Sequence, residues 1–357
     1  MSVKVMAYDT ANPGDTSDFA RKLATLDPGR VRALALLVKT EGNSEVNDFS
    51  REYALLAAEQ ALRSHGGESL VRRTTFLIST GCEGAMTPFG YLFADVDEPG
   101  AIPDMGGRAL AMGCARSRSL TSDEIGTVAQ AHITAETVRS AMAQADVEAA
   151  DVELVIVKTP IMTLIPATAG QLENRRITSA YSKAIASLGA GFALGEIDES
   201  KLDPRIFDTD HSVYARRVMS FSGSEMDCIE VMLLANRTGQ AGDLVIKTGF
   251  LADLLDAPGL RATLRGAGVA LDTEGRVVNS SGVIALLAKV GVAPDGSLRG
   301  HRTTMKSSHI DMDKHARATV SGVIGSILGS CRAFISANTV HQAPPGGGLC
   351  AIIVKSE

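Results

Sequence analysis

One pattern of hydrophobic and polar positions recurs three times along the chain. It is a short apolar run that ends in a lysine, and its copies occupy residues 34–39, 154–158 and 283–289. A short apolar run between polar or glycine-rich stretches is typical of a buried β-strand. We therefore expect three buried strands, each of which carries its lysine to the edge of a sheet.

The sequence that follows each of these strands also recurs. A basic residue comes next, in an alanine- and glycine-rich stretch that we expect to be helical, and these residues are Arg51, Lys183 and Arg317. A second apolar run then closes on serine, at residues 76–79, 218–222 and 334–336. A further strand-like run completes each copy, at residues 91–94, 231–234 and 351–354.

This order predicts three similar units. Turn-rich stretches at residues 95–107 and 236–243 separate them, so we place the units at 1–98, 107–239 and 243–357. Strands mixed with helices on one face indicate an α+β fold. Three such units pack most simply about a pseudo-threefold axis, which would gather three lysines, three further basic residues and three serines at the centre.

The composition excludes several classes of function. The chain has 357 residues, of which 45% are hydrophobic and 21% charged, as in ordinary globular proteins. A net charge of −6 and only 4% aromatic residues, with no tryptophan, argue against a nucleic-acid partner. No run reaches the roughly 18 apolar residues that a membrane helix needs, and the N-terminus lacks the apolar core of a signal peptide. The five cysteines form no Cys-x-x-Cys pair, which predicts a cytoplasmic protein without a cysteine-based zinc site.

A serine and a lysine together suit acyl-transfer chemistry. Serine is a weak nucleophile until a base removes its proton, and a lysine can be that base when burial and nearby positive charge lower its pKa. Basic residues that converge on one centre would favour neutral lysine, and the remaining charges would hold an oxygen-bearing ring. Backbone N–H groups in the turns after the serines could stabilise a developing oxyanion. We therefore expect acyl transfer on a small planar substrate of near-threefold symmetry.

Specific motifs are spread over the whole chain. They lie at residues 13–17 (Pro-Gly-Asp-Thr-Ser), 39–43 (Lys-Thr-Glu-Gly-Asn), 46–54, 79–84 (Ser-Thr-Gly-Cys-Glu-Gly), 293–296, 315–318 and 341–348. Through them the sequence resembles the ring-opening amidohydrolases, the family of cyanuric acid hydrolase and barbiturase. The resemblance implies a central barrel of sheet with helices outside, and one active site with three Ser–Lys pairs on the threefold axis. It also implies hydrolysis of a cyclic amide or imide, cyanuric acid or a barbiturate-like ring.

The resemblance assigns roles to residues of this chain. It pairs Lys39 with Ser79 in the first unit and Lys289 with Ser336 in the third. Lys158 matches the lysine of the second pair, which is the pair thought to do the chemistry in this family.

The second unit departs from the family's pattern at its basic residue. Arg51 and Arg317 match the family's substrate-gripping arginines, but Lys183 takes the place of the third arginine. Lysine keeps the positive charge and loses the planar fork of hydrogen-bond donors. This replacement weakly favours a barbiturate-like or other less symmetric ring over cyanuric acid.

The serine of the second pair is not fixed by the sequence. Counted back from Glu225 without a gap, Phe221 falls at its position, whereas a shift of one residue brings in Ser222 or Ser220. We favour Ser222, because the Gly223 that follows it gives the flexible turn that an oxyanion site needs.

The expected reaction follows from these assignments. Lys158 takes the proton from Ser222, which attacks a ring carbonyl; the C–N bond breaks, and water then releases the acyl group. Ser79 and Ser336 polarise the other two carbonyls. The further residues expected to bind the substrate are Lys39, Arg51, Thr80, Lys183, Gly223, Lys289, Arg317 and Ala337.

Two alternatives stay open. Phe221 at the position of the nucleophile would suit a protein that binds a cyclic imide without turnover. The other alternative is a hydrolase for a different ring, with Ser79 and Lys39 as the working pair.

The resemblance also bears on metals and on assembly. Relatives hold a structural divalent cation near the C-terminal glycine loop, with a carboxylate two residues after the third lysine, and that position is Gly291 here. We expect no such ion, or a weaker one, and no other cofactor. Relatives form tetramers, so we expect a homo-oligomer that takes a small cyclic imide as its substrate.

Overall fold

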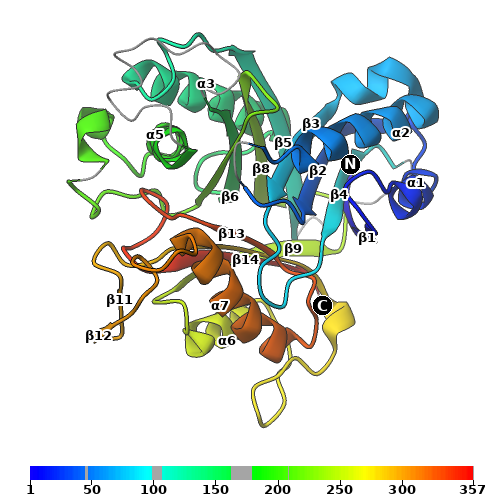
Figure 1. Ribbon diagram of the computed structural model, residues 1–357. Coiled ribbons are helices and arrows are strands. Elements are labelled where there is room, and N and C mark those ends of the chain that lie inside the picture. The colour runs from blue at the N-terminus through cyan, green and yellow to red at the C-terminus, as the bar shows by residue number, and fades with distance from the viewer. Residues whose placement is uncertain (45–46, 99–106, 162–178, 208, 357) are drawn as a thin grey trace.

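The computed structural model describes residues 1–356 except 45–46, 99–106, 162–178 and 208. Sheets lie at the middle of the molecule and helices cover their outer sides (Figure 1). The strands are β1 (Ser2–Asp9), β2 (Val31–Thr40), β3 (Thr74–Thr80), β4 (Phe89–Val96), β5 (Arg108–Ser119), β6 (Val152–Pro160), β7 (Val218–Gly223), β8 (Cys228–Thr238), β9 (Leu244–Leu251), β10 (Val283–Val290), β11 (Ser297–Leu298), β12 (His301–Arg302), β13 (Phe334–Ala337) and β14 (Gly348–Lys355). The helices are α1 (Ser17–Leu23), α2 (Ser50–Arg72), α3 (Val128–Ala145), α5 (Ser179–Ala193), α6 (Ala257–Gly266) and α7 (Met312–Leu328), with short 3-10 turns η1 (Glu199–Lys201), η2 (Pro204–Ile206) and η3 (Ser280–Gly282).

Three four-stranded sheets share one strand order. The orders are β1-β4-β2-β3, β5-β8-β6-β7 and β9-β14-β10-β13. In each sheet the strand with the lysine runs parallel to the strand with the serine motif, and the other neighbours are antiparallel. The result is a mixed fold of helices and several sheets. The closed barrel, the threefold axis and the unit boundaries remain predictions, and most of the predicted linker at 95–107 lies outside the described residues.

The register places the predicted site residues at equivalent positions. Lys39 in β2 lies opposite Ser79 in β3, and Lys289 in β10 lies opposite Ser336 in β13. In the second sheet Lys158 of β6 lies opposite Phe221 of β7. The three lysines therefore occupy the same place in their sheets, and Phe221 takes the place of a serine.

The core explains why the lysines point inward. Side chains alternate between the two faces of a strand, and Leu37, Ile156 and Leu287 belong to one hydrophobic cluster that all three sheets share. The opposite faces pack beneath helices in separate clusters. Each lysine follows one of these three residues by two positions, so its side chain lies on the inner face.

Side chains join the sheets where backbone hydrogen bonds end. β3 and β7 are the last strands of their sheets, so their outward N–H groups need other partners. The N–H of Phe76 in β3 donates to Glu230 Oε2 of β8 at 2.6 Å. The N–H of Ser220 in β7 donates to Gln342 Oε1 at 2.6 Å.

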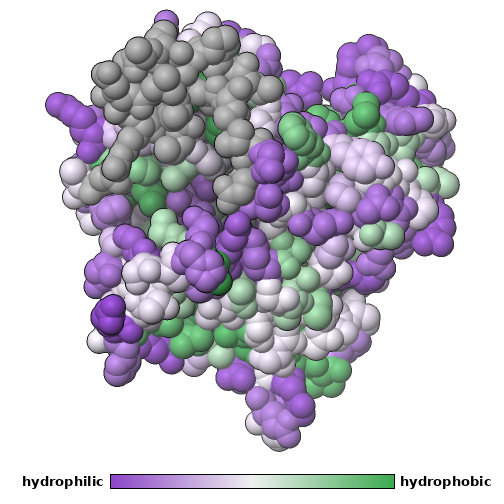
Figure 2. Space-filling view, viewed as in Figure 1, coloured by the Kyte–Doolittle hydropathy of each residue, from purple (hydrophilic) through white to green (hydrophobic). Residues whose placement is uncertain are grey.

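The helices and the visible surface bear on possible membrane contact. Within the described part of the chain, no helix is long and apolar enough to cross a bilayer. Figure 2 shows one face, where hydrophobic residues occur in small patches among hydrophilic ones.

Candidate active site

The first lysine and serine are in direct contact. Lys39 Nζ lies 3.2 Å from Ser79 Oγ, and it donates a hydrogen bond to the carbonyl oxygen of Thr80 at 2.9 Å. Burial, together with the nearby charge of Arg317, lowers the pKa of Lys39 to about 7. An amine with this pKa is largely neutral above pH 7, so it can accept a proton from the serine hydroxyl.

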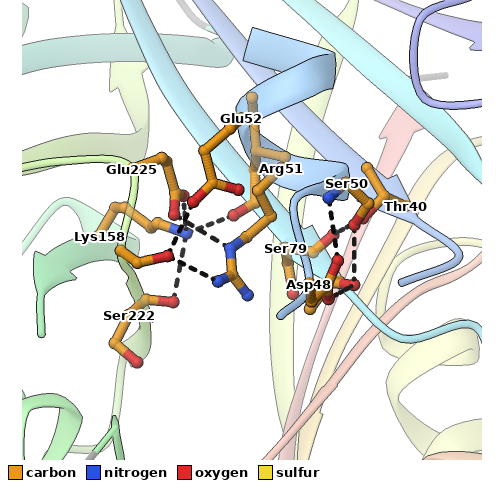
Figure 3. A network of polar contacts seen from close by, with 12 residues as sticks. Thr40, Asp48, Ser50, Arg51, Glu52, Ser79, Lys158, Ser222 and Glu225 are labelled. Carbon is orange, nitrogen blue, oxygen red and sulfur yellow. Dashed lines mark hydrogen bonds and ion pairs between the residues drawn. The ribbon is translucent and has the colours of Figure 1, made fainter. Parts of the chain in front are cut away.

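Asp48 fixes the turn that surrounds this pair. Its carboxylate accepts hydrogen bonds from the backbone N–H of Ser50 at 3.0 Å and from the Thr80 hydroxyl at 2.8 Å. The hydroxyls of Ser50 and Thr40 are 2.8 Å apart. Figure 3 shows how these contacts join the ends of β2 and β3 to the start of α2. The Thr80 side chain is therefore engaged by Asp48, and only its backbone faces Lys39.

The third lysine and serine form a similar contact. Lys289 Nζ lies 3.1 Å from Ser336 Oγ, and both side chains are buried. Burial lowers the pKa of Lys289 well below its usual value, and the positive charge of Lys183 adds to this shift. Ala337, the next residue of β13, lies opposite Val290 in the sheet.

The second lysine has different partners. Lys158 Nζ forms an ion pair with Glu225 Oε1 at 2.6 Å, and it donates to the backbone carbonyls of Ser222, at 3.3 Å, and of Ile78 (Figure 3). Burial lowers the pKa of Lys158, while the Glu225 carboxylate acts in the opposite direction. Three acceptors around one nitrogen match the three N–H bonds of an ammonium. This geometry suits a charged lysine better than a base.

Ser222 does not occupy the position that we expected for it. Phe221 shares the inner cluster, whereas Val218, four residues before Ser222 and on the same side of β7, packs beneath the helices. Alternation therefore turns the Ser222 side chain to the helix side. Its hydroxyl lies 2.6 Å from Ser179 Oγ, and only its carbonyl oxygen meets Lys158.

Both arginines of the predicted site are held by carboxylates. Arg51 Nε donates to Glu225 Oε2 at 3.0 Å. Arg317 forms a two-pronged pair with Glu83, at 2.5 and 2.8 Å. Gly81 has φ +94° and a Cβ placed there would meet the Arg317 guanidinium at 2.8 Å, so this close approach requires a glycine.

Our sequence reasoning missed the roles of these two carboxylates. A signal was present, because Glu83 follows Ser79 by four residues and Glu225 follows Phe221 by the same interval. Each links its own sheet to an arginine on a helix from another sheet's part of the chain.

Two further predicted residues have clear positions. Lys183 is buried on α5, and burial lowers its pKa, while Asp313 acts in the opposite direction. Gly223 ends β7 next to Glu225, whose carboxylate fills the space where a side chain at Gly223 would lie.

The three lysines belong to one buried cluster. Lys39 Nζ lies 5.5 Å from the centre of the Phe334 ring, and Lys289 Nζ lies 4.9 Å from the centre of the Phe221 ring. The two rings touch, with centres 5.3 Å apart. Because Lys158 bonds to the carbonyl of Ile78, the residue before Ser79, it adjoins the same cluster.

Gly291, where the sequence predicted no carboxylate ligand for a cation, lies against the side chain of Thr339. A Cβ at Gly291 would lie 2.1 Å from Thr339 Oγ1, so a side chain there would have to displace the threonine hydroxyl. The Thr339 hydroxyl instead donates to the carbonyl of Gly347 at 3.4 Å. Among the residues that the structure describes, no three His, Cys, Asp or Glu side chains lie together as a group that could hold a metal ion.

Comparisons with known proteins identify a family. Residues 4–355 match the family described as amidohydrolase ring-opening protein. A cyclic amide hydrolase of Azorhizobium caulinodans is 33% identical over 370 residues, covering 100% of both chains. A cyanuric acid amidohydrolase of Enterobacter cloacae is 33% identical over 386 residues, again covering 100% of both.

Solved structures show the same architecture. A cyanuric acid hydrolase superposes with a TM-score of 0.88 at 30% identity and covers 99% of each chain. The cyanuric acid hydrolase from A. caulinodans superposes with a TM-score of 0.86 at 32% identity, covering 100% of this chain and 99% of its own.

Proposed function

Because this chain belongs to the ring-opening amidohydrolases, we propose that it hydrolyses a cyclic amide or imide with Ser79 as the nucleophile and Lys39 as its base. The observation that carries this assignment is the contact of 3.2 Å between a serine hydroxyl and an amine whose pKa is about 7. Lys39 has one backbone acceptor besides Ser79, so its lone pair is free for the hydroxyl proton.

The reaction proceeds in two halves. Lys39 takes the proton of Ser79 Oγ as that oxygen bonds to a ring carbonyl carbon. The ring C–N bond then breaks, and the Lys39 ammonium returns the proton to the departing nitrogen, which leaves an ester on Ser79. Water attacks this ester with Lys39 again as base, the C–O bond breaks, and Ser79 regains its proton while the opened product leaves as a carboxylic acid.

The other two lysines serve binding and charge stabilisation in this proposal. Lys158 stays protonated by its three acceptors and adds positive charge beside the first pair. Lys289 and Ser336 direct a second polar group to the ring. We infer that the three sheets meet about a pseudo-threefold axis, since they share one strand order and one inner cluster. The substrate that suits this arrangement is a small planar molecule bound between the pairs.

A comparison of single serine variants tests the assignment. The purified protein and its Ser79→Ala, Ser336→Ala and Ser222→Ala variants would be given cyanuric acid, barbituric acid and dihydrouracil, while ring absorbance and product are followed. Loss of a nucleophile costs at least about 10³-fold in kcat, so Ser79→Ala should lose activity on this scale. Ser222→Ala should lose less than about 10-fold. The reverse order would restore Lys158 and Ser222 as the working pair.

A binding protein without turnover is the second candidate, and Phe221 is the observation that favours it. Here, calorimetry would show a cyclic imide bound by the wild type with no product formed over hours. Ring opening by the wild type that is lost in Ser79→Ala would exclude this candidate.

A further inference from the structure

Phe221 stands where the second sheet should present a hydroxyl. Its place opposite Lys158 corresponds to that of Ser79 opposite Lys39 and of Ser336 opposite Lys289. Its side chain is on the inner face, and it is 2% exposed, against 8% for Ser79 and 7% for Ser336. Three equivalent positions therefore offer two hydroxyls and one phenyl ring.

The phenyl ring lies beside the third lysine–serine pair. Its centre is 4.9 Å from Lys289 Nζ and 5.3 Å from the centre of the Phe334 ring, which packs against it nearly edge-on at 62°. Phe334 precedes Ser336 by two residues on the same face of β13. The ring of Phe221 thus makes one inner side of the site apolar.

This asymmetry bears on which ring fits. A molecule with three equivalent carbonyls would direct two of them to Ser79 and Ser336 and the third to the phenyl ring. That third oxygen would leave water without gaining a hydrogen bond, which disfavours its binding. A ring with C–H groups at this edge would instead gain apolar contact.

Resting on the hydrolase function proposed above, we propose that Phe221 makes the site specific for rings with two carbonyls and one hydrocarbon edge. Dihydropyrimidinediones and glutarimides belong to this class of cyclic imides. Cyanuric acid, which has three carbonyls, does not, and barbituric acid keeps three carbonyls with one CH₂ group.

The test measures substrate preference in three forms of the protein. Values of kcat/KM would be determined for dihydrouracil, glutarimide, barbituric acid and cyanuric acid with wild type, Phe221→Ser and Phe221→Leu. A single mismatched contact in a pocket shifts kcat/KM by about 10- to 200-fold. The wild type should thus prefer the two-carbonyl rings over cyanuric acid by at least about 10-fold. Phe221→Ser should move this ratio toward cyanuric acid by a similar factor, and Phe221→Leu, which stays apolar, should keep the wild-type preference.

The outcomes separate this inference from the function on which it rests. Equal or better use of cyanuric acid by the wild type, or an equal shift in Phe221→Leu and Phe221→Ser, would overturn the role of Phe221 while ring opening stands. If the wild type opens none of the four rings, the hydrolase proposal fails. In that case the Kd values of the four rings, measured by calorimetry, test the role of Phe221 separately. Tighter binding of the two-carbonyl rings than of cyanuric acid supports it, and the reverse order overturns it. If Phe221→Ser does not fold, the wild-type ratio and Phe221→Leu still decide it.

Discussion

Single residues acquire their chemistry here from what surrounds them. Lys39 is an ordinary amine in the sequence, and burial together with Arg317 brings its pKa to about 7. Lys158 has the same place in its sheet but meets Glu225 and two backbone carbonyls, which favour its charged form. Two lysines at equivalent positions therefore differ in their chemistry: Lys39 is a candidate base, and Lys158 is a candidate permanent positive charge.

The pH dependence of the reaction should follow Lys39. Its amine is neutral above its lowered pKa and charged below it, so kcat/KM should fall as the pH drops through about 7. Arg317→Gln removes a charge that lowers this pKa, so the acid limb should move to higher pH. Arg332→Gln, at an exposed ion pair with Asp9, is the matched control and should leave the limb in place. A limb that is unmoved in Arg317→Gln would exclude Lys39 as the base.

The sequence gives good guidance at this scale except in the second unit. The recurrence predicted that lysines and serines gather at one centre, and the family resemblance paired Lys39 with Ser79 and Lys289 with Ser336, which the structure brings into contact. The choice of Ser222 required a shift of one residue, and such a shift moves a side chain to the opposite face of its strand. The ungapped count, which placed Phe221 opposite Lys158, agrees with the register.

At the scale of elements, buried ion pairs connect helices to the ends of strands. α2 supplies Arg51 to Glu225 beyond β7, and α7 supplies Arg317 to Glu83 beyond β3. The recurring apolar runs predicted the lysine and serine strands, because their length and flanks are characteristic. These pairs were not predicted, because they link segments far apart in the chain and depend on how the sheets meet.

Loss of the buried carboxylate should be costly. Burial alone would raise the pKa of Glu225, and the charges of Lys158 and Arg51 outweigh it and lower the pKa. Glu225→Gln leaves two buried cations without their anion, so the free energy of unfolding should fall by about 3–5 kcal/mol. Denaturant unfolding measures this loss. The control is Glu68→Gln, whose carboxylate is 54% exposed and pairs with Arg63; it should cost no more than about 1 kcal/mol. Equal losses in both variants would contradict a structural role for the network.

At the scale of the whole molecule, each sheet comes from one continuous stretch of chain. The three stretches repeat one strand order, and side chains such as Glu230 and Gln342 close the gaps between neighbouring sheets. The repeat of hydrophobic runs predicted three groups of strands. It did not show β5 and β9 or the side-chain links, since these have no counterpart in the recurring pattern.

The stability of the molecule should not depend on a divalent cation. Thr339 fills the space beside Gly291, and the glycine loop is held by its own bonds, including Gly291 N to Gly347 O at 3.1 Å. Dialysis against a chelator should therefore change Tm by less than about 2 °C. Removal of an ion held at 100 times its Kd would instead lower the free energy of unfolding by about 2.7 kcal/mol and lower Tm further than this. Scanning calorimetry before and after dialysis measures this. A larger fall in Tm that calcium or magnesium reverses would show that an ion is held after all.

Three sheets that share one inner cluster within a single polypeptide can be altered one at a time. If three identical short chains built the same arrangement, symmetry would repeat every substitution three times, and a phenylalanine would eliminate all the hydroxyls together. In this chain Phe221 replaces one of them while Ser79 and Ser336 remain. Covalent linkage thus lets each third of the chain change independently. Selection can then alter the residues that face one edge of a bound compound and leave the residues at its other edges unchanged.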